Sequence, residues 1–345
     1  MKKQLIVGAL ASTFVLGGIG ATVEASPQEK PNAVKGEYGY DVKKKLEKHL
    51  KDQENILEAD VLKKFKSEFA EVDGNTIHYK VYQGKKNAKK TYVVVHGATA
   101  TLETTKVYAA ALAKENPDAR ILLVDLPLRG QSTSATFTTA DISIEKYADI
   151  MKQFIEQKRA DGIIKGKLNY SGWSMGGSIG MKLELAGAPI DELVLINTSP
   201  VWESIEGLKA VFGIESFTPE IISMMTAGNY TEEVAQGMDF DTYMDKFHGS
   251  PVVGAADFNA LSVDAYDVRE QLNQIDAKTL IFSGTLDDLA EPRMQTLMDG
   301  QIPKSELVMY ENGHDMFMKP EIAQEMAKEI TQYFEKKNGK KEGHK

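Results

Sequence analysis

Short apolar runs alternate with longer amphipathic stretches along most of the chain. Patterns of buried strands lie at residues 91–95, 121–124, 167–170, 193–196, 279–282 and 307–310. Helical patterns fall between them, at residues 104–114, 144–158, 178–185 and 321–334. Strands that alternate with helices need crossover connections, which favour a mostly parallel sheet with helices on both faces. The chain is therefore predicted to be an α/β protein.

One segment interrupts this alternation. About 80 residues separate the strand that ends at Ile196 from the strand that starts at Thr279, which is far longer than an ordinary connection. The segment is rich in methionine and phenylalanine. We predict that residues 201–262 form an inserted helical cap over the edge where the strands end, which is where open α/β sheets bind ligands. The core would then comprise residues 71–200 and 263–335.

The N-terminus has the pattern of an export signal. Lys2 and Lys3 precede an apolar stretch from Leu5 to Gly20, and Val23-Glu24-Ala25 fits a cleavage site with small residues. Residues 1–25 are therefore predicted to be a signal peptide that leads to a secreted or cell-surface protein. The alternative is a retained membrane anchor, although the apolar stretch is short for a span of about 20 residues.

The region between the signal and the core is polar and charged. Residues 26–40 are rich in Pro, Gly, Lys and Glu, which predicts a linker. From Asp41 to Phe69 apolar residues recur at helical spacing, which predicts an amphipathic extension, so residues 26–70 form a linker and a helical N-terminal extension. Residues 336–345 are expected to form a charged tail.

Composition excludes several functions. The 345 residues carry a formal net charge of −9, which argues against a general nucleic-acid binder and leaves a small molecule as the expected partner. The chain has no cysteine, so disulfides, thiolate metal sites and a cysteine nucleophile are excluded. No metal-binding or nucleotide-binding motif is present, and we predict neither a metal nor another cofactor. The sequence leaves the oligomeric state open.

A G-x-S-x-G pentapeptide carries the clearest chemical signal. Gly172-Trp173-Ser174-Met175-Gly176 follows the predicted strand at 167–170 and precedes the predicted helix at 178–185. This strand–turn–helix setting is typical of a nucleophile elbow, in which a tight turn presents the serine hydroxyl above the sheet. The alternative is a glycine-rich turn with a capping serine. Because a serine hydroxyl needs a base to remove its proton, a histidine is expected nearby.

His314 is the best candidate for that base, because only this histidine lies on a glycine-containing loop after a late strand. Of the other five, His96 follows the strand at 91–95, and the remainder are expected to serve at the surface or in packing. A carboxylate should hold the imidazole tautomer. Asp287 is the candidate, and the adjacent Asp288 is its rival.

Together these stretches resemble the α/β-hydrolase family from about Phe69 to Phe334. The matching stretches are the hairpin from Val72 to Tyr82, His96-Gly97, the stretch from Asp125 to Ser132, Gly284 to Asp287, and Asn312 to His314. The stretch from Asp125 resembles D-x-P-G-x-G-x-S, with Leu128 where glycine is usual. The nucleophile, acid and histidine follow in the family's order.

The resemblance implies the α/β-hydrolase fold and a capped, esterase-like or lipase-like serine hydrolase. Ser174 would be the nucleophile, His314 the general base and Asp287 the acid. By the same resemblance the backbone amides of Ala98 and Met175 would form the oxyanion hole, and His96 would shape the loop around Ala98.

The expected reaction is hydrolysis of an ester, or a related acyl bond, of a small apolar substrate through an acyl-enzyme. An aminopeptidase-like enzyme or a lactone hydrolase on the same fold remains an alternative. A non-catalytic binding protein on this scaffold is a further alternative, since a fold does not fix a function.

Overall fold

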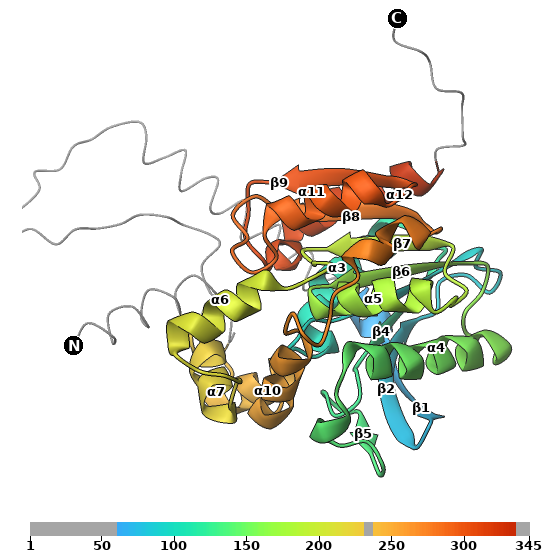
Figure 1. Ribbon diagram of the computed structural model, residues 1–345. Helices are drawn as coiled ribbons and strands as arrows, with labels where there is room; N and C mark the ends of the chain where they lie inside the picture. Colours follow the sequence, from blue (N-terminus) through green and yellow to red (C-terminus); the bar gives the residue numbers. More distant parts are fainter. Residues whose placement is uncertain (1–60, 231–236, 336–345) are drawn as a thin grey trace, which may run out of the picture.

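The computed structural model describes residues 61–230 and 237–335 (Figure 1). The predicted signal peptide, the linker and the charged tail therefore lie outside the described residues. In the part of the chain that is described, no helix is both long and apolar enough to cross a membrane.

A nine-stranded sheet forms the centre, in the order β1-β2-β4-β3-β6-β7-β8-β9, with β5 paired to β2. β2 is antiparallel to β1, β4 and β5, and every pair from β4 to β9 is parallel. The strands are β1 Lys66–Val72, β2 Asn75–Tyr82, β3 Lys90–Val95, β4 Arg120–Val124, β5 Thr133–Ser134, β6 Lys167–Trp173, β7 Glu192–Ile196, β8 Lys278–Gly284 and β9 Ser305–Tyr310. All six predicted strands are present, and the mostly parallel sheet is confirmed, although β9 at the edge of the sheet has no buried residue.

The prediction of a helix that continues to Phe69 is wrong at its end, because Lys66–Val72 is strand β1. A tight turn at Asp73 (φ 50°) and Gly74 (φ 75°) folds β1 back onto β2, so that Ala70 pairs with Ile77. Only Ala70 and Val72 of this strand are buried. Pairing in the hairpin thus overrides the local helical spacing, and the sheet begins before residue 71.

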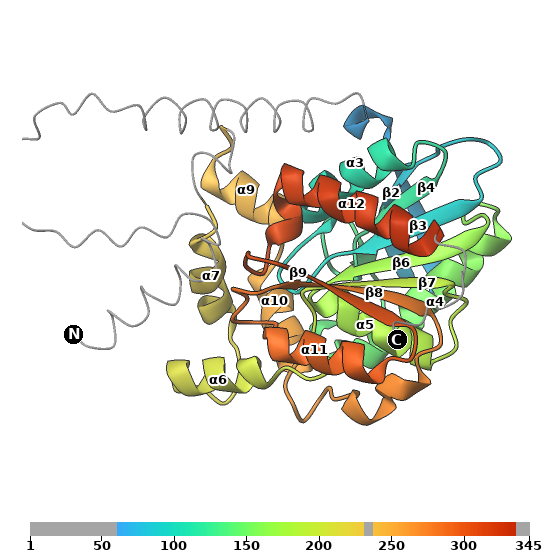
Figure 2. The ribbon, with the colours of Figure 1, turned by 90° about the horizontal axis from the view of Figure 1, so that it is seen from above.

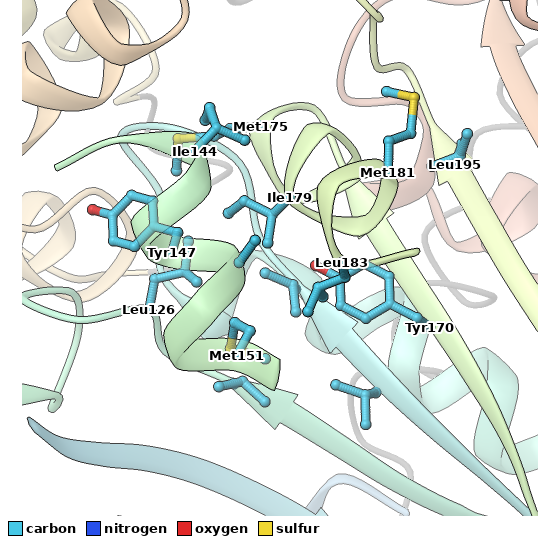
Figure 3. Packing of buried hydrophobic residues seen from close by; sticks show 14 of the residues in the cluster. Leu126, Ile144, Tyr147, Met151, Tyr170, Met175, Ile179, Met181, Leu183 and Leu195 are labelled. Carbon is cyan, nitrogen blue, oxygen red and sulfur yellow. The ribbon is translucent and has the colours of Figure 1, made fainter. Parts of the chain in front are cut away.

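Helices cover both faces of the sheet (Figures 1 and 2). On one face α4 lays its apolar stripe against the sheet beside α5, and Figure 3 shows Met151 and Ile179 packed in this layer with Tyr170 of β6. On the other face α3 and α12 pack together. The helices of the core are α3 Lys106–Glu115, α4 Ile144–Ala160, α5 Met175–Leu185, α11 Pro292–Gln301 and α12 Pro320–Glu335, with short 3-10 turns η1 Leu62–Lys64, η2 Leu102–Thr105, η3 Thr139–Asp141, η4 Arg269–Gln274 and η5 Met316–Met318.

The described part of the insertion is helical. Its helices are α6 Glu203–Phe212, α7 Pro219–Ala227, α9 Phe240–Phe247 and α10 Pro251–Ala260. A fully buried ion pair between Arg129 and Asp257 joins α10 to the loop after β4, and the Tyr147 hydroxyl donates to the same carboxylate at 2.9 Å. The amide of Thr101, in the loop after β3, donates to the Phe247 carbonyl at 3.1 Å. The insertion therefore packs on the edge where the parallel strands end.

Candidate active site

Ser174 lies at the turn between β6 and α5 and has an unusual backbone conformation, with φ 53° and ψ −122°. Its amide donates to the Ile196 carbonyl at 2.9 Å, and its own carbonyl accepts from the Thr198 hydroxyl at 2.7 Å. A non-glycine residue in this region is strained and persists only where its surroundings hold it. The two contacts with the chain after β7 supply that support, and the strained turn is the one that a nucleophile elbow requires.

Glycines allow the chain to approach itself closely around Ser174. A Cβ atom at Gly172 would lie 2.2 Å from the Gly176 carbonyl oxygen, and one at Gly176 would lie 2.5 Å from the Val95 oxygen. A Cβ atom at Gly97 would lie 2.9 Å from the Ser174 Cβ. Each of these contacts is shorter than any real side chain tolerates, so the glycines of the pentapeptide and of the loop after β3 are required by packing.

The structure brings His314 and Asp287 together. The imidazole Nδ1 lies 2.8 Å from Asp287 Oδ2, and the other carboxylate oxygen accepts from the amides of Leu289 at 2.9 Å and Ala290 at 2.8 Å. Asp287 is buried, whereas Asp288 is exposed. Because a carboxylate can only accept here, Nδ1 carries the proton and Nε2 carries the lone pair that a general base needs.

Sequence reasoning missed Asn197, which follows β7 and ties both loops of this pair together. Its Nδ2 donates to the carbonyls of Gly313 at 3.0 Å and His314 at 2.8 Å, and its Oδ1 accepts from the Gly284 amide at 2.7 Å. The side chain is fully buried, and φ is 42°. The signal in the sequence was a polar residue at the end of a buried strand, on the edge that carries the site.

Two indole rings lie against the His314 ring. The ring centroids of Trp173 and His314 are 5.4 Å apart, and those of Trp202 and His314 are 6.5 Å apart. The Trp173 Nε1 also donates to the His314 carbonyl at 2.9 Å. These contacts limit the movement of the imidazole and surround it with apolar surface.

The two predicted oxyanion donors lie on either side of the elbow. Met175 is the first residue of α5, so its amide has no acceptor within the helix, and the helix N-terminus favours negative charge. Ala98 follows Gly97, whose backbone packs directly against Ser174. The site thus offers two backbone positions at which a developing oxyanion could be stabilised.

His96 holds the loop that carries Ala98. The Leu126 amide donates to its Nε2 at 3.1 Å, so the proton is on Nδ1, which donates to the Gly97 carbonyl at 2.8 Å. The ring is fully buried, and burial lowers the pKa of His96. A neutral imidazole with both nitrogens engaged holds the backbone of this loop, which is the role that the resemblance implied.

The insertion contacts the same loop through His248. Its Nδ1 donates to the carbonyl of Thr99 at 2.9 Å, and Thr99 has the strained φ of 52°. Burial lowers the pKa of His248. The end of α9 therefore helps to hold the backbone next to Ala98 in a conformation that it would not adopt alone.

The stretch from Asp125 to Ser132 departs from the family pattern at Leu128. This residue has φ 64°, in the left-handed region that favours glycine. Leu128 is partly buried and packs against the core. The unusual residue thus occupies the conformation for which glycine is usual, and its packing offsets part of the backbone cost.

Among residues 61–230 and 237–335, no group of three or more His, Asp or Glu side chains is arranged to hold a metal ion. The carboxylates and imidazoles of the site form pairs instead. The prediction that no cofactor is needed remains a prediction.

The chain matches a known protein family. The family described as alpha/beta hydrolase fold matches residues 92–321. The chain therefore belongs to the α/β-hydrolase family, and it is a hydrolase. A pimeloyl-[acyl-carrier protein] methyl ester esterase from Nitrosomonas europaea is 23% identical over 215 residues, which cover 58% of this chain and 79% of that protein.

Solved structures agree on the fold. An esterase from Exiguobacterium antarcticum aligns with a TM-score of 0.59 and 20% identity, over 78% of this chain and 99% of the other. An enol-lactonase from Burkholderia xenovorans LB400 aligns with a TM-score of 0.57 and 21% identity, over 77% and 99%. At this level of identity the likeness concerns the fold.

Proposed function

We propose that this hydrolase cleaves an ester, or a related acyl bond, of a small apolar substrate through an acyl-enzyme on Ser174. The observation that carries the proposal is the strained Ser174 at the start of α5, on the same edge of the sheet as the His314–Asp287 pair. The similarity to esterases supports an ester as the substrate.

The chemistry follows from the geometry. The Ser174 Oγ attacks the acyl carbonyl carbon while His314 Nε2 takes its proton, and the amides of Ala98 and Met175 stabilise the oxyanion. The imidazolium, held by Asp287, then gives its proton to the leaving alcohol. A water molecule attacks the acyl-enzyme by the same route, which releases the acid and restores the serine.

An apolar substrate is supported by the surroundings of His314. The indoles of Trp173 and Trp202 flank the imidazole, and Leu286, beside Asp287, is 60% exposed. The phenylalanines Phe217 and Phe258 of the insertion, by contrast, pack on each other and form its own core. The two tryptophans are buried, so of these groups the exposed Leu286 is the one that a bound acyl group could contact.

A screen of the purified protein tests the proposal. We expect turnover of p-nitrophenyl esters of graded chain length, and covalent labelling by a fluorophosphonate at Ser174 that is absent from Ser174→Ala. Turnover of aminoacyl anilides without ester cleavage would favour the peptidase alternative, and turnover restricted to lactones the lactonase. The absence of labelling and of all turnover would favour a binding protein.

We also propose that the chain is exported, on the basis of residues 1–25. N-terminal sequencing of protein recovered outside the cytoplasm should begin near Ser26. A product that starts at Met1 and stays with the membrane fraction would instead indicate a retained anchor.

A further inference from the structure

Lysines gather at the edge of the sheet opposite the site. Lys85, Lys86 and Lys89 lie in the connection between β2 and β3, Lys165 precedes β6, and Lys167 is its first residue. The two loops are in contact, since Lys165 Nζ donates to the Lys86 carbonyl at 3.4 Å and the Lys167 amide donates to the Lys89 carbonyl at 2.9 Å. We call these five residues the lysine edge.

Nearby acidic groups neutralise only part of this charge. Asp118 pairs with Lys85 at 2.8 Å, and the buried Glu192 lies 3.7 Å from Lys167. The pair with Asp118 is exposed and therefore weak. Lys86 and Lys89 are exposed, and no ion pair in the described part of the chain involves either of them.

Helix α12, the last described element of the chain, ends at the same edge. Lys278, the first residue of β8, donates to the Tyr333 carbonyl near the end of α12. The sequence continues past Glu335 with residues 336–345, which contain five lysines and one glutamate. Helix α12 therefore ends at the same edge of the sheet, and the residues that follow it in the sequence are mostly basic.

The opposite end of the molecule is acidic. Residues 201–262 contain ten acidic side chains and two lysines. The helices of this insertion and the end of α12 lie at opposite ends of the sheet (Figures 1 and 2). The acidic insertion thus lies at the end of the sheet that carries the candidate active site, opposite the lysine edge (Figure 1).

We propose that the lysine edge binds the surface of an anionic lipid bilayer and turns the Ser174 side of the molecule toward the aqueous phase. Lysines on loops at one edge suit a diffuse negative surface, which attracts each nearby lysine without specific geometry. The acidic insertion would be repelled by the same surface. The net charge of −9 disfavours nucleic acid as the partner, because nucleic acid is itself a polyanion.

This inference rests on the proposed export, which would bring the chain to a membrane, and it deepens the proposed function. A site that faces water would take a soluble ester, whereas a lipid substrate in the same bilayer would be out of reach. The orientation therefore points to small esters that arrive from solution.

Co-sedimentation with vesicles tests the proposal. The purified full chain is mixed with phosphatidylcholine vesicles, with or without about a third phosphatidylglycerol, at low and high salt. The partition coefficient with phosphatidylglycerol is divided by the partition coefficient without it. This ratio separates the electrostatic part of binding from any insertion of the apolar N-terminus. We expect a ratio well above one that falls toward one at high salt.

Two matched variants locate the contact. Lys86→Gln/Lys89→Gln should lower the ratio by about 25-fold, because each lysine near an anionic surface contributes about five-fold. Lys209→Gln/Lys246→Gln, which removes the same charge from the insertion, should leave the ratio unchanged or raise it.

Three results would overturn the inference. A wild-type ratio of one, or equal losses in the two double variants, would exclude the lysine edge as the contact. Binding to long-chain polyphosphate without binding to vesicles would replace the bilayer by a soluble polyanion. Loss of esterase activity in Ser174→Ala, with vesicle binding intact, would separate this inference from the proposed reaction.

Discussion

Two histidine–aspartate pairs of this hydrolase have nearly the same geometry. His314 Nδ1 lies 2.8 Å from Asp287, and His78 Nδ1 lies 2.7 Å from Asp125. In the second pair the other ring nitrogen, Nε2, lies 3.1 Å from the hydroxyl of Ser67. By side-chain contacts alone, Ser67, His78 and Asp125 would look like a second catalytic triad.

The backbone separates the two sets. Ser67 lies in the extended strand β1, without positive φ and without a helix behind it, whereas Ser174 is strained and begins α5. Asp125 also accepts from the amides of Leu102 at 2.8 Å and Gln131 at 3.1 Å, so it fastens two loops to β2. We infer that a histidine–aspartate pair becomes catalytic only beside a strained serine with oxyanion donors, and that the pair on β2 is structural.

The largest effect should come from the serines. Ser174→Ala is expected to lower turnover of p-nitrophenyl butyrate by about 10⁴-fold or more, since the reaction loses its nucleophile. Ser67→Ala should change turnover by less than about two-fold, as exposed positions away from a site usually do. Equal turnover of Ser174→Ala and wild type, with both folded by circular dichroism, would refute the assignment.

Substitutions of the adjacent aspartates Asp287 and Asp288 should differ strongly in their effect on turnover. Asp287→Asn is expected to lower turnover by up to about 10⁴-fold, because His314 then holds the wrong tautomer. Asp288→Asn should cost only a few-fold, since this carboxylate is exposed and does not contact the ring. Turnover of one ester by each variant decides between them, and a severe loss at Asp288 with a mild one at Asp287 would reverse the assignment.

Asp125→Asn should act on folding instead. The amide group cannot accept from His78, Leu102 and Gln131 as a carboxylate does, and a buried network that loses a charged member costs about 2–4 kcal/mol. Urea unfolding should show this loss while turnover per folded molecule changes little. A large loss of turnover with unchanged stability would mean that the second pair takes part in the reaction.

Asn197 should have an intermediate effect. Asn197→Asp keeps the shape, but a carboxylate cannot donate to the carbonyls of Gly313 and His314 and would repel them. A misplaced base is expected to lower kcat by about 100-fold, with little change in KM. A loss of thermal stability with a normal kcat in the folded fraction would show that Asn197 has only a structural role.

Local sequence patterns predict most of the fold. Strands β3, β4 and β7 contain continuous apolar runs and are buried, and such runs are what a strand covered on both faces requires. β1 could not be predicted in this way, because its exposed outer residues mimic the spacing of a helix and only pairing with β2 decides its structure.

The residues of the candidate site also divide into those that a local motif predicts and those that only the structure reveals. Ser174, Asp287 and His314 each lie in a short motif, so the sequence could name them, and the contact with Asp287 distinguishes the two adjacent aspartates. Asn197 and the Arg129–Asp257 pair depend on partners far away in the chain. No local pattern predicts which distant group a buried polar side chain will meet, so these residues emerge only from the structure.

The smallest expected effect concerns the pH dependence of stability, and it distinguishes the buried histidines from His314, the proposed general base. His96 is buried and neutral, and burial lowers its pKa, whereas in the unfolded chain it titrates near 6.5. Below about pH 6.5 the unfolded chain therefore binds a proton that the folded chain does not. The contribution of His96 to stability is fully present above that pH and is lost as the pH falls.

His96→Gln removes this titration. The slope of the unfolding free energy between about pH 5 and 6.5 should fall by up to about 1.4 kcal/mol per pH unit, the limit for one proton. Urea unfolding at several pH values measures the slope, which is compared rather than the absolute stability because glutamine also loses contacts with Leu126 and Gly97. His248→Gln should act in the same direction, since burial lowers the pKa of His248 as well. An unchanged slope in both variants would show that neither ring is held neutral by the fold, and the loop around Ala98 would then need another support.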